Sequence, residues 1–277
     1  MPEVARVALV TGASSGIGEA AAVELARRGF TVYGAARRVE RMAALVDRGL
    51  HVIGMDVTDD ASMTSGVERI LREQGRIDVL VNNAGYGSYG ALEDVPMEEA
   101  RRQFEVNVFG LARLTQLVLP HLRAQHSGRI VNVSSIGGKM YEPLGSWYHA
   151  TKFAVEGLSD SLRVELAPHG VHVIVIEPGA IRTEWGGISA ASALERSGDT
   201  AYAKQARQLA DVYDVADRPR VGADPRVVGV VIANAVTARR PRTRYAVPTS
   251  AKAILLARRL LTDRAFDAVI TRAYGMR

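Results

Sequence analysis

The segment Thr11-Gly12-Ala13-Ser14-Ser15-Gly16-Ile17-Gly18 decides the fold, because it joins an apolar strand-like run to a helical pattern through a glycine-rich turn. Residues 5–10 before it are mostly apolar, and residues 17–28 after it carry apolar side chains at helical spacing. Glycines in this context bring backbone N–H groups close to a pyrophosphate at the helix N-terminus. The segment therefore predicts a dinucleotide site formed by Gly12, Ser14, Ser15, Gly16, Ile17 and Gly18. An ordinary strand-to-helix turn is the alternative.

Outward from this turn, strand-like runs alternate with helical patterns. The runs are residues 5–10, 31–35, 51–55, 77–81, 129–133, 171–176 and 243–247. Helical spacing covers residues 17–28, 62–73, 98–124, 151–167, 227–237 and 250–272. Such alternation predicts a parallel sheet buried on both faces. We expect an α/β fold with a single Rossmann-like domain over residues 1–277, a doubly wound parallel sheet flanked by helices. Residues 184–220, where the helical periodicity is broken, are predicted to form a helical substrate lid; a plain solvated connection is the alternative.

The end of the second strand indicates which dinucleotide binds. NAD-specific folds usually place an Asp or Glu there, which holds the ribose hydroxyls. This strand ends instead in Arg37 and Arg38. Because a guanidinium suits a 2′-phosphate, we expect NADP as the cofactor, with Arg37 carrying most of the preference. Capping of the next helix is the alternative role for Arg38.

Two further turns follow predicted strands. Asp56 and Val57 come after the third strand, where a carboxylate can meet the adenine amino group. Asn83, Ala84 and Gly85 come after the fourth, where a turn close to the cofactor forms the floor beneath it. We expect all five residues to bind the cofactor, although either turn alone is also typical of ordinary loops.

A candidate catalytic pair follows the fifth strand. Tyr148 and Lys152 are four residues apart and therefore lie on one face of a helix. A nearby ammonium stabilises phenolate and lowers a tyrosine pKa toward working pH, as general acid–base catalysis requires. We take Tyr148 as the acid–base residue. The neighbouring His149 points to another helix face and is expected to be part of the scaffold.

The combined motifs resemble the short-chain dehydrogenase/reductase family, in its order and spacing, from about residue 5 to 185. They are the glycine-rich turn, Asn82–Gly85, Asn107, Ser135 thirteen residues before Tyr148, Lys152, and Pro178-Gly179-x-x-x-Thr183. Residues 240–245 and the final helix look like the branch with 17β-hydroxysteroid and retinol dehydrogenases.

The resemblance implies a role for each matched residue. Ser135 would hydrogen-bond the substrate oxygen, Tyr148 would exchange its proton, and Lys152 would hold the nicotinamide ribose and lower the tyrosine pKa. Asn107 would anchor a water that links Lys152 to solvent. The resemblance also implies nicotinamide contacts from Pro178, Gly179, Ile181 and Thr183, and a homodimer through helices 98–124 and 151–167, with a tetramer as the alternative.

Composition excludes several other classes. The chain has no cysteine, which excludes disulfides and thiolate chemistry. Its net charge is +5, but the arginines are spread along the chain among acidic residues, so we expect no nucleic-acid binding. The histidines lie at no metal-ligand spacing, and we expect no metal. We also expect no signal peptide, no membrane insertion and a cytoplasmic protein.

The sequence therefore predicts an NADP(H)-dependent oxidoreductase that interconverts an alcohol and a carbonyl by hydride transfer. Apolar residues in the predicted lid favour a steroid-like, retinoid-like or long-chain substrate; they are Trp185, Ile188, Leu194, Tyr202 and Leu209. Tyr86, Tyr89, Met140, Tyr141 and Glu142 are further pocket candidates. A non-catalytic NADP(H) sensor and an isomerase or dehydratase on the same scaffold are the alternatives.

Overall fold

The central strand β1 (Val7–Thr11) is buried along its whole length, as its continuous apolar sequence predicts. The structure is a computed structural model that describes residues 5–219 and 221–276. The first four residues, on which the expectation about a signal peptide depends, lie outside the described part. So does Arg220, the last residue of the predicted lid.

Seven parallel strands form one sheet in the order β3-β2-β1-β4-β5-β6-β7. Besides β1 they are β2 (Thr31–Ala36), β3 (His51–Gly54), β4 (Val79–Asn82), β5 (Gly128–Val133), β6 (Val171–Pro178) and β7 (Arg244–Val247). The strand order reverses between β1 and β4, and ligands of such sheets bind at the carboxyl ends of the strands on either side of this point. The predicted doubly wound sheet is confirmed.

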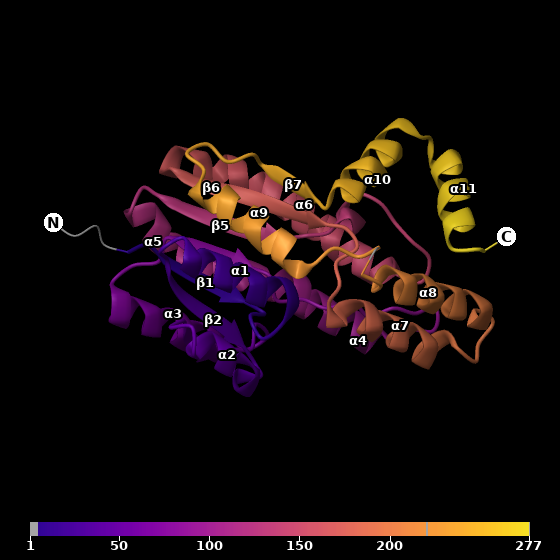
Figure 1. Ribbon diagram of the computed structural model, residues 1–277, viewed down its shortest axis with the longest axis horizontal. Helices are drawn as coiled ribbons and strands as arrows, with labels where there is room; N and C mark the ends of the chain where they lie inside the picture. Colours follow the sequence, from indigo (N-terminus) through magenta and orange to yellow (C-terminus); the bar gives the residue numbers. More distant parts are fainter. Residues whose placement is uncertain (1–4, 220, 277) are drawn as a thin grey trace.

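Helices cover both faces of the sheet, and each face has its own core (Figure 1). On one face lie α1 (Gly16–Arg27), α2 (Ala43–Val46) and α9 (Pro225–Thr237). On the other lie α3 (Asp60–Gln74), α5 (Leu111–Ala124) and α6 (Ser146–Leu166). Short 3₁₀ turns at Val39–Met42, Ile136–Gly138 and Ala167–His169 connect these layers to the sheet.

Four more helices gather beyond the carboxyl ends of the strands (Figure 1). Helices α7 (Glu184–Ser197) and α8 (Ala203–Ala216) fill the predicted lid segment. Helices α10 (Thr249–Leu260) and α11 (Asp263–Ala273) lie beside them, and the carbonyl of Gly275, after α11, accepts a hydrogen bond from Gln208 of α8. No helix among the described residues has both the length and the apolarity that crossing a membrane requires.

Three helix boundaries differ from the sequence prediction. The expected helix 98–124 is α4 (Met97–Phe104), a π-helical turn (Glu105–Gly110) and α5. The expected final helix 250–272 divides into α10 and α11, because Leu261 and Thr262 adopt extended backbone angles. Helix α6 begins five residues earlier than expected, at Ser146, so its first turn includes Tyr148.

Candidate active site

The glycine-rich turn after β1 packs against the turn after β4. Gly12 and Gly16 have φ angles of 65° and 58°, in the left-handed region that favours glycine. A Cβ at Gly18 would lie 2.3 Å from the carbonyl oxygen of Gly12, so only glycine fits there. The Thr11 hydroxyl accepts hydrogen bonds from the backbone N–H groups of Asn83 and Ala84, each at 3.0 Å. These contacts fix the two turns relative to each other.

A cavity of about 920 Å³ opens over these turns. It is lined by Ser135 and by all the predicted cofactor residues except two: Gly12, Ser14, Ser15, Gly16, Ile17, Arg37, Arg38, Asp56, Val57, Asn83, Ala84, Gly85, Tyr148, Lys152, Pro178, Gly179, Ile181 and Thr183. The exceptions are Gly18 and Asn107, which lie behind the wall. Gly18 acts through packing, because it allows α1 to approach the turn.

The adenosine end of the cavity carries both predicted arginines. Arg38 lies 3.7 Å from Glu184 at the start of α7, and Arg41 also binds Glu184, at 2.5 Å. Asp56 accepts hydrogen bonds from the backbone and hydroxyl of Thr58, at 2.9 and 2.8 Å. Burial raises the pKa of Asp56, but the Thr58 hydrogen bonds and the charge of Arg37 together bring it below its ordinary value. Among the described residues, Arg37 forms no ion pair with a carboxylate, which leaves its guanidinium available to a ligand.

Tyr148 and Lys152 are buried where β5 and α6 meet, 6% and 9% exposed. The Lys152 ammonium donates a hydrogen bond to the Val133 carbonyl at 3.0 Å and lies 5.9 Å from the Tyr148 ring centroid. Burial lowers the pKa of Lys152 to about 8, against the raising effect of Glu156. Burial also raises the pKa of Tyr148, a hydrogen bond with Ser135 lowers it, and the charge of Glu142 raises it further. The expectation of a lowered tyrosine pKa is therefore wrong for the protein alone.

Ser135 and Asn107 are held by backbone groups. The Ser135 hydroxyl accepts a hydrogen bond from the Gly137 N–H at 3.0 Å. The Asn107 side chain accepts from the Tyr86 N–H at 3.1 Å, and donates to the Tyr86 carbonyl at 2.9 Å and to Thr151 at 3.1 Å. Asn107 lies in the π-helical turn, where regular helical hydrogen bonding is interrupted. The sequence pattern of residues 98–124 gives no sign of this turn.

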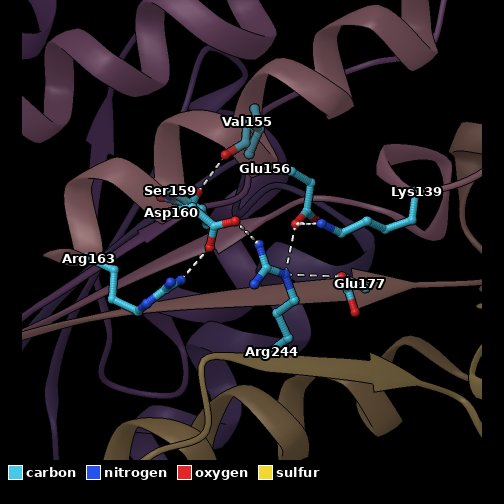
Figure 2. Close-up of polar contacts among 9 residues, drawn as sticks. Lys139, Val155, Glu156, Ser159, Asp160, Arg163, Glu177 and Arg244 are labelled. Carbon is cyan, nitrogen blue, oxygen red and sulfur yellow. Dashed lines mark hydrogen bonds and ion pairs between the residues drawn. The ribbon is translucent and has the colours of Figure 1, made fainter.

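One turn along α6 from Lys152, at Glu156, Arg244 of β7 joins three buried or half-buried carboxylates (Figure 2). It lies 2.9 Å from Glu156, 2.8 Å from Asp160 and 3.5 Å from Glu177, and Lys139 lies 3.1 Å from Glu156. This network fixes the edge strand to α6. Sequence reasoning missed it, because Arg244 is 67 to 88 residues away from its three carboxylates along the chain.

The substrate end of the cavity has walls from four segments. Trp185, Ile188, Val212 and Tyr213 come from α7 and α8, and Ile254, Phe266, Val269 and Ile270 from α10 and α11. Trp185 and Ile188 line the cavity, as predicted. Leu209 instead is fully buried in the core between α8 and its neighbours. Leu194 and Tyr202 also do not line the cavity. Of the loop candidates, Tyr86, Met140 and Glu142 line it, whereas Tyr89 is buried behind it and Tyr141 binds Asp267.

A family model described as short chain dehydrogenase matches residues 6–191. The chain belongs to the short-chain dehydrogenase/reductase family. It is 37% identical to a 3-ketodihydrosphingosine reductase of Bacteroides thetaiotaomicron, over 87% of each chain. It is 36% identical to an NADPH-dependent 3-dehydrocapnine reductase of Ornithobacterium rhinotracheale, over 95% of each chain.

Solved structures similar to this chain belong to the same family. A short-chain dehydrogenase from Streptomyces avermitilis superposes with a TM-score of 0.78 at 35% identity, covering 99% of this chain and 97% of that one. A metagenomic short-chain oxidoreductase in complex with NADP has a TM-score of 0.69 at 28% identity, covering 87% and 96%. This short-chain dehydrogenase is therefore an oxidoreductase that uses a nicotinamide dinucleotide.

The residues present fit such a cofactor. The glycine-rich turn precedes the N-terminus of α1, where backbone N–H groups and the helix dipole favour a pyrophosphate. Glycine is required at Gly12 and Gly16 by their φ angles, so the backbone can approach a ligand closely. The cavity continues from this turn to Tyr148, and it is large enough for a dinucleotide and part of a substrate.

Sequence reasoning also missed what surrounds Glu142. The hydroxyl groups of Tyr89, Tyr213 and Tyr274 all donate to its carboxylate. His149 lies beside it, with Nε2 accepting a hydrogen bond from the Glu142 N–H at 3.0 Å and Nδ1 lying 2.9 Å from the Gly137 carbonyl. His149 thus supports the loop, as the predicted scaffold role requires. The contacts of Glu142 come from distant segments, and no local pattern reveals them.

Proposed function

We propose that this short-chain dehydrogenase interconverts an alcohol and a carbonyl with NADP(H), on a hydrophobic substrate, with Tyr148 as the acid–base residue. One observation carries the proposal: Ser135, Tyr148 and Lys152 lie on one wall of the cavity that the glycine-rich turn also lines. When bound, the nicotinamide supplies or accepts the hydride. The protein's own side chains then manage the proton and the charge on the substrate oxygen.

In reduction, Tyr148 donates its proton to the substrate oxygen, and in oxidation it takes that proton back. Its raised pKa keeps the phenol protonated in the free protein, which suits the donor role. The hydrogen bond that the Ser135 hydroxyl donates to the Pro178 carbonyl is long, at 3.4 Å, so its proton can turn to the substrate oxygen instead. Lys152 uses one N–H on Val133 and keeps two for the ribose and for Tyr148.

Asn107 acts as a positioning residue in this proposal. Both N–H groups of its side chain are engaged with Tyr86 and Thr151, and the backbone of the π-helical turn would hold a water near Lys152. Such a water would connect the Lys152 ammonium to solvent and resupply the proton that Tyr148 gives away.

Arg37 supports NADP(H) over NAD(H). It follows β2 at the adenosine end of the cavity, where no Asp or Glu terminates the strand. Arg38 and Arg41 share Glu184, so Arg37 is the guanidinium with the freest access to a 2′-phosphate. One relative is named as NADPH-dependent, in agreement with this assignment.

A hydrophobic substrate is supported by the apolar and aromatic side chains of α7, α8, α10 and α11 that line the substrate end. Two relatives are named as reductases of 3-ketodihydrosphingosine and of 3-dehydrocapnine. The steroid and retinoid branch stays a prediction. We also propose a homodimer, because Phe109 and Phe153 are each about half exposed on the helices expected to meet a partner.

The test is turnover with NADPH and NADH, followed by nicotinamide absorbance, on long-chain ketones and alcohols, steroids and retinoids. We expect NADPH-dependent reduction, and Tyr148→Phe should lower kcat/KM by about 10³-fold. A Tyr148→Phe enzyme with near-normal turnover would exclude the acid–base role. Cofactor binding without any absorbance change on these substrates would favour the sensor or the isomerase.

A further inference from the structure

Glu142 places a carboxylate in a cavity wall that is otherwise mostly apolar. It lies in the loop between Ile136–Gly138 and α6, and its side chain is 14% exposed to the cavity. Tyr89 donates to one carboxylate oxygen at 2.5 Å, Tyr213 donates to the same oxygen, and Tyr274 donates to the other. A carboxylate can accept about four hydrogen bonds, so one position remains open, on the oxygen that Tyr274 contacts.

The partners of Glu142 donate hydrogen bonds but bring no positive charge. Burial first, and then the charge of Glu142, raise the pKa values of Tyr89, Tyr213 and Tyr274, so these phenols stay protonated. The nearest base is His149, 4.0 Å away, whose hydrogen bonds place its proton on Nδ1, pointing away from Glu142. Among the described residues, no lysine or arginine forms an ion pair with this carboxylate. A buried carboxylate without a cationic partner is costly.

The position of Glu142 relative to Tyr148 indicates which part of a substrate would meet the Glu142 carboxylate. The ring of Tyr89, whose hydroxyl bonds Glu142, lies 5.6 Å from the Tyr148 ring, and the Trp185 ring packs against both, 5.0 Å from Tyr148 and 5.9 Å from Tyr89. A substrate oxygen at Tyr148 would therefore lie close to the carboxylate. The apolar side chains of α10 and α11 extend the cavity beyond it.

From this arrangement we propose that Glu142 binds an ammonium group next to the reacting carbonyl, so that the substrate is an amino ketone or amino alcohol with a long alkyl chain. Tyr148 and Ser135 meet the oxygen, Glu142 meets the cation, and α10 and α11 cover the chain. The inference rests on the proposed function, because it assigns the substrate oxygen to Tyr148.

The experiment compares oxidation of 2-aminododecan-3-ol, its N-acetyl derivative and dodecan-3-ol by the NADP-loaded enzyme. We expect the amino alcohol to be preferred over both uncharged alcohols by about 20-fold or more in kcat/KM, the scale of one charged hydrogen bond. Glu142→Gln should abolish this preference, and Glu142→Asp should keep part of it. Tyr274→Phe removes one phenol but keeps the carboxylate, and should retain the preference.

Equal turnover of the charged and uncharged alcohols by the wild-type enzyme would overturn the inference, whether or not the variants fold. A Glu142→Gln enzyme that keeps the wild-type preference would also overturn it. Calorimetric binding of the three alcohols to the NADP-loaded protein separates the two proposals. Ammonium-dependent binding without oxidation would reject the proposed function alone, and oxidation of all three without preference would reject only the role of Glu142.

Discussion

The two ends of the cavity are built in different ways. The cofactor end is made of turns at the carboxyl ends of neighbouring strands, where backbone groups and glycines define the surface. The substrate end is made of side chains from the loop before α6 and from α7, α8, α10 and α11. Each turn of the first is therefore a short local sequence at the end of a strand, whereas the second depends on side-chain contacts between distant segments. Tyr148 and Lys152 lie where the two ends meet.

Lys152→Met should produce the largest effect, because it removes the charge at this junction. We expect kcat/KM to fall by about 10³-fold. The free energy of unfolding, in contrast, should increase. The folded pKa of Lys152 is about 8, below its ordinary value of 10.5, so below pH 8 the folded protein bears the full cost of burying the ammonium.

The variant should therefore be more stable than the wild type below this pH, by roughly 1–3 kcal/mol. The difference should shrink as the pH rises from about 8 to 10.5, where the unfolded lysine also loses its proton. Urea unfolding of both proteins across this range measures it. A pH-independent difference would mean that lost packing, and not charge burial, dominates.

Gly18→Ala tests whether the cofactor end tolerates a single added methyl group. The new Cβ would meet the Gly12 carbonyl at 2.3 Å and the Asn83 side chain at 2.5 Å, so the turn must move. We expect a loss of about 2–4 kcal/mol of stability and a matching loss of NADPH affinity, read by thermal unfolding and fluorescence titration.

Gly157→Ala is the matched control, because Gly157 in α6 has no atom within 4 Å of its would-be Cβ. It should be neutral or stabilise by up to about 1 kcal/mol. If Gly18→Ala behaves like this control, the rigid backbone fit described for the turn is incorrect.

What the sequence could predict follows the same division. The glycine-rich turn, the strand–helix alternation that predicts the parallel sheet, and the pair Tyr148 and Lys152 are local patterns. The structure brings the turn and the pair to one cavity. The π-helical turn at Asn107 could not be predicted, because it changes the backbone hydrogen bonding of the helix and leaves the spacing of the apolar residues unchanged. The Asn107 side chain bonds Tyr86, which is 21 residues away along the chain. The tyrosines around Glu142 and the carboxylates around Arg244 meet only after the chain folds. Their sequence separations, up to 132 residues, leave no local periodicity to read.

Arg37→Ala tests the adenosine end, where we expect one side chain to set the preference for NADPH over NADH in a site built mostly from backbone groups. We expect kcat/KM with NADPH to fall by about 10- to 100-fold, as loss of a charged hydrogen bond would cause, and the value with NADH to change much less. Arg41→Ala is the control. It removes the same charge nearby, but its guanidinium is bound to Glu184 and does not line the cavity. If both variants shift the ratio of NADPH to NADH activity equally, the general positive field, and not Arg37, sets the preference.

Glu177→Gln should have the smallest effect, and it tests what supports the substrate end. Strand β7 leads into α10, whose Ile254 and Ala257 line the cavity, and Arg244 holds β7 to Glu156, Asp160 and Glu177 (Figure 2). Burial and the charge of Glu156 raise the pKa of Glu177 to about 7, although Arg244 and Lys139 oppose this. The folded protein therefore binds more protons than the unfolded chain between the ordinary pKa of 4.5 and about 7, and this residue makes folding less favourable as the pH rises through that interval.

Glutamine keeps the shape and removes the titration. The variant should be close to wild-type stability below pH 4.5 and more stable by roughly 1–2 kcal/mol above pH 7, with the gain developing between these values. Denaturant unfolding at a series of pH values measures the difference. A variant that is less stable above pH 7 would show that the Glu177–Arg244 pair stabilises the edge strand by more than its burial costs. The substrate end would then depend on the complete ion network, whereas the glycine-rich turn of the cofactor end depends on its backbone conformation.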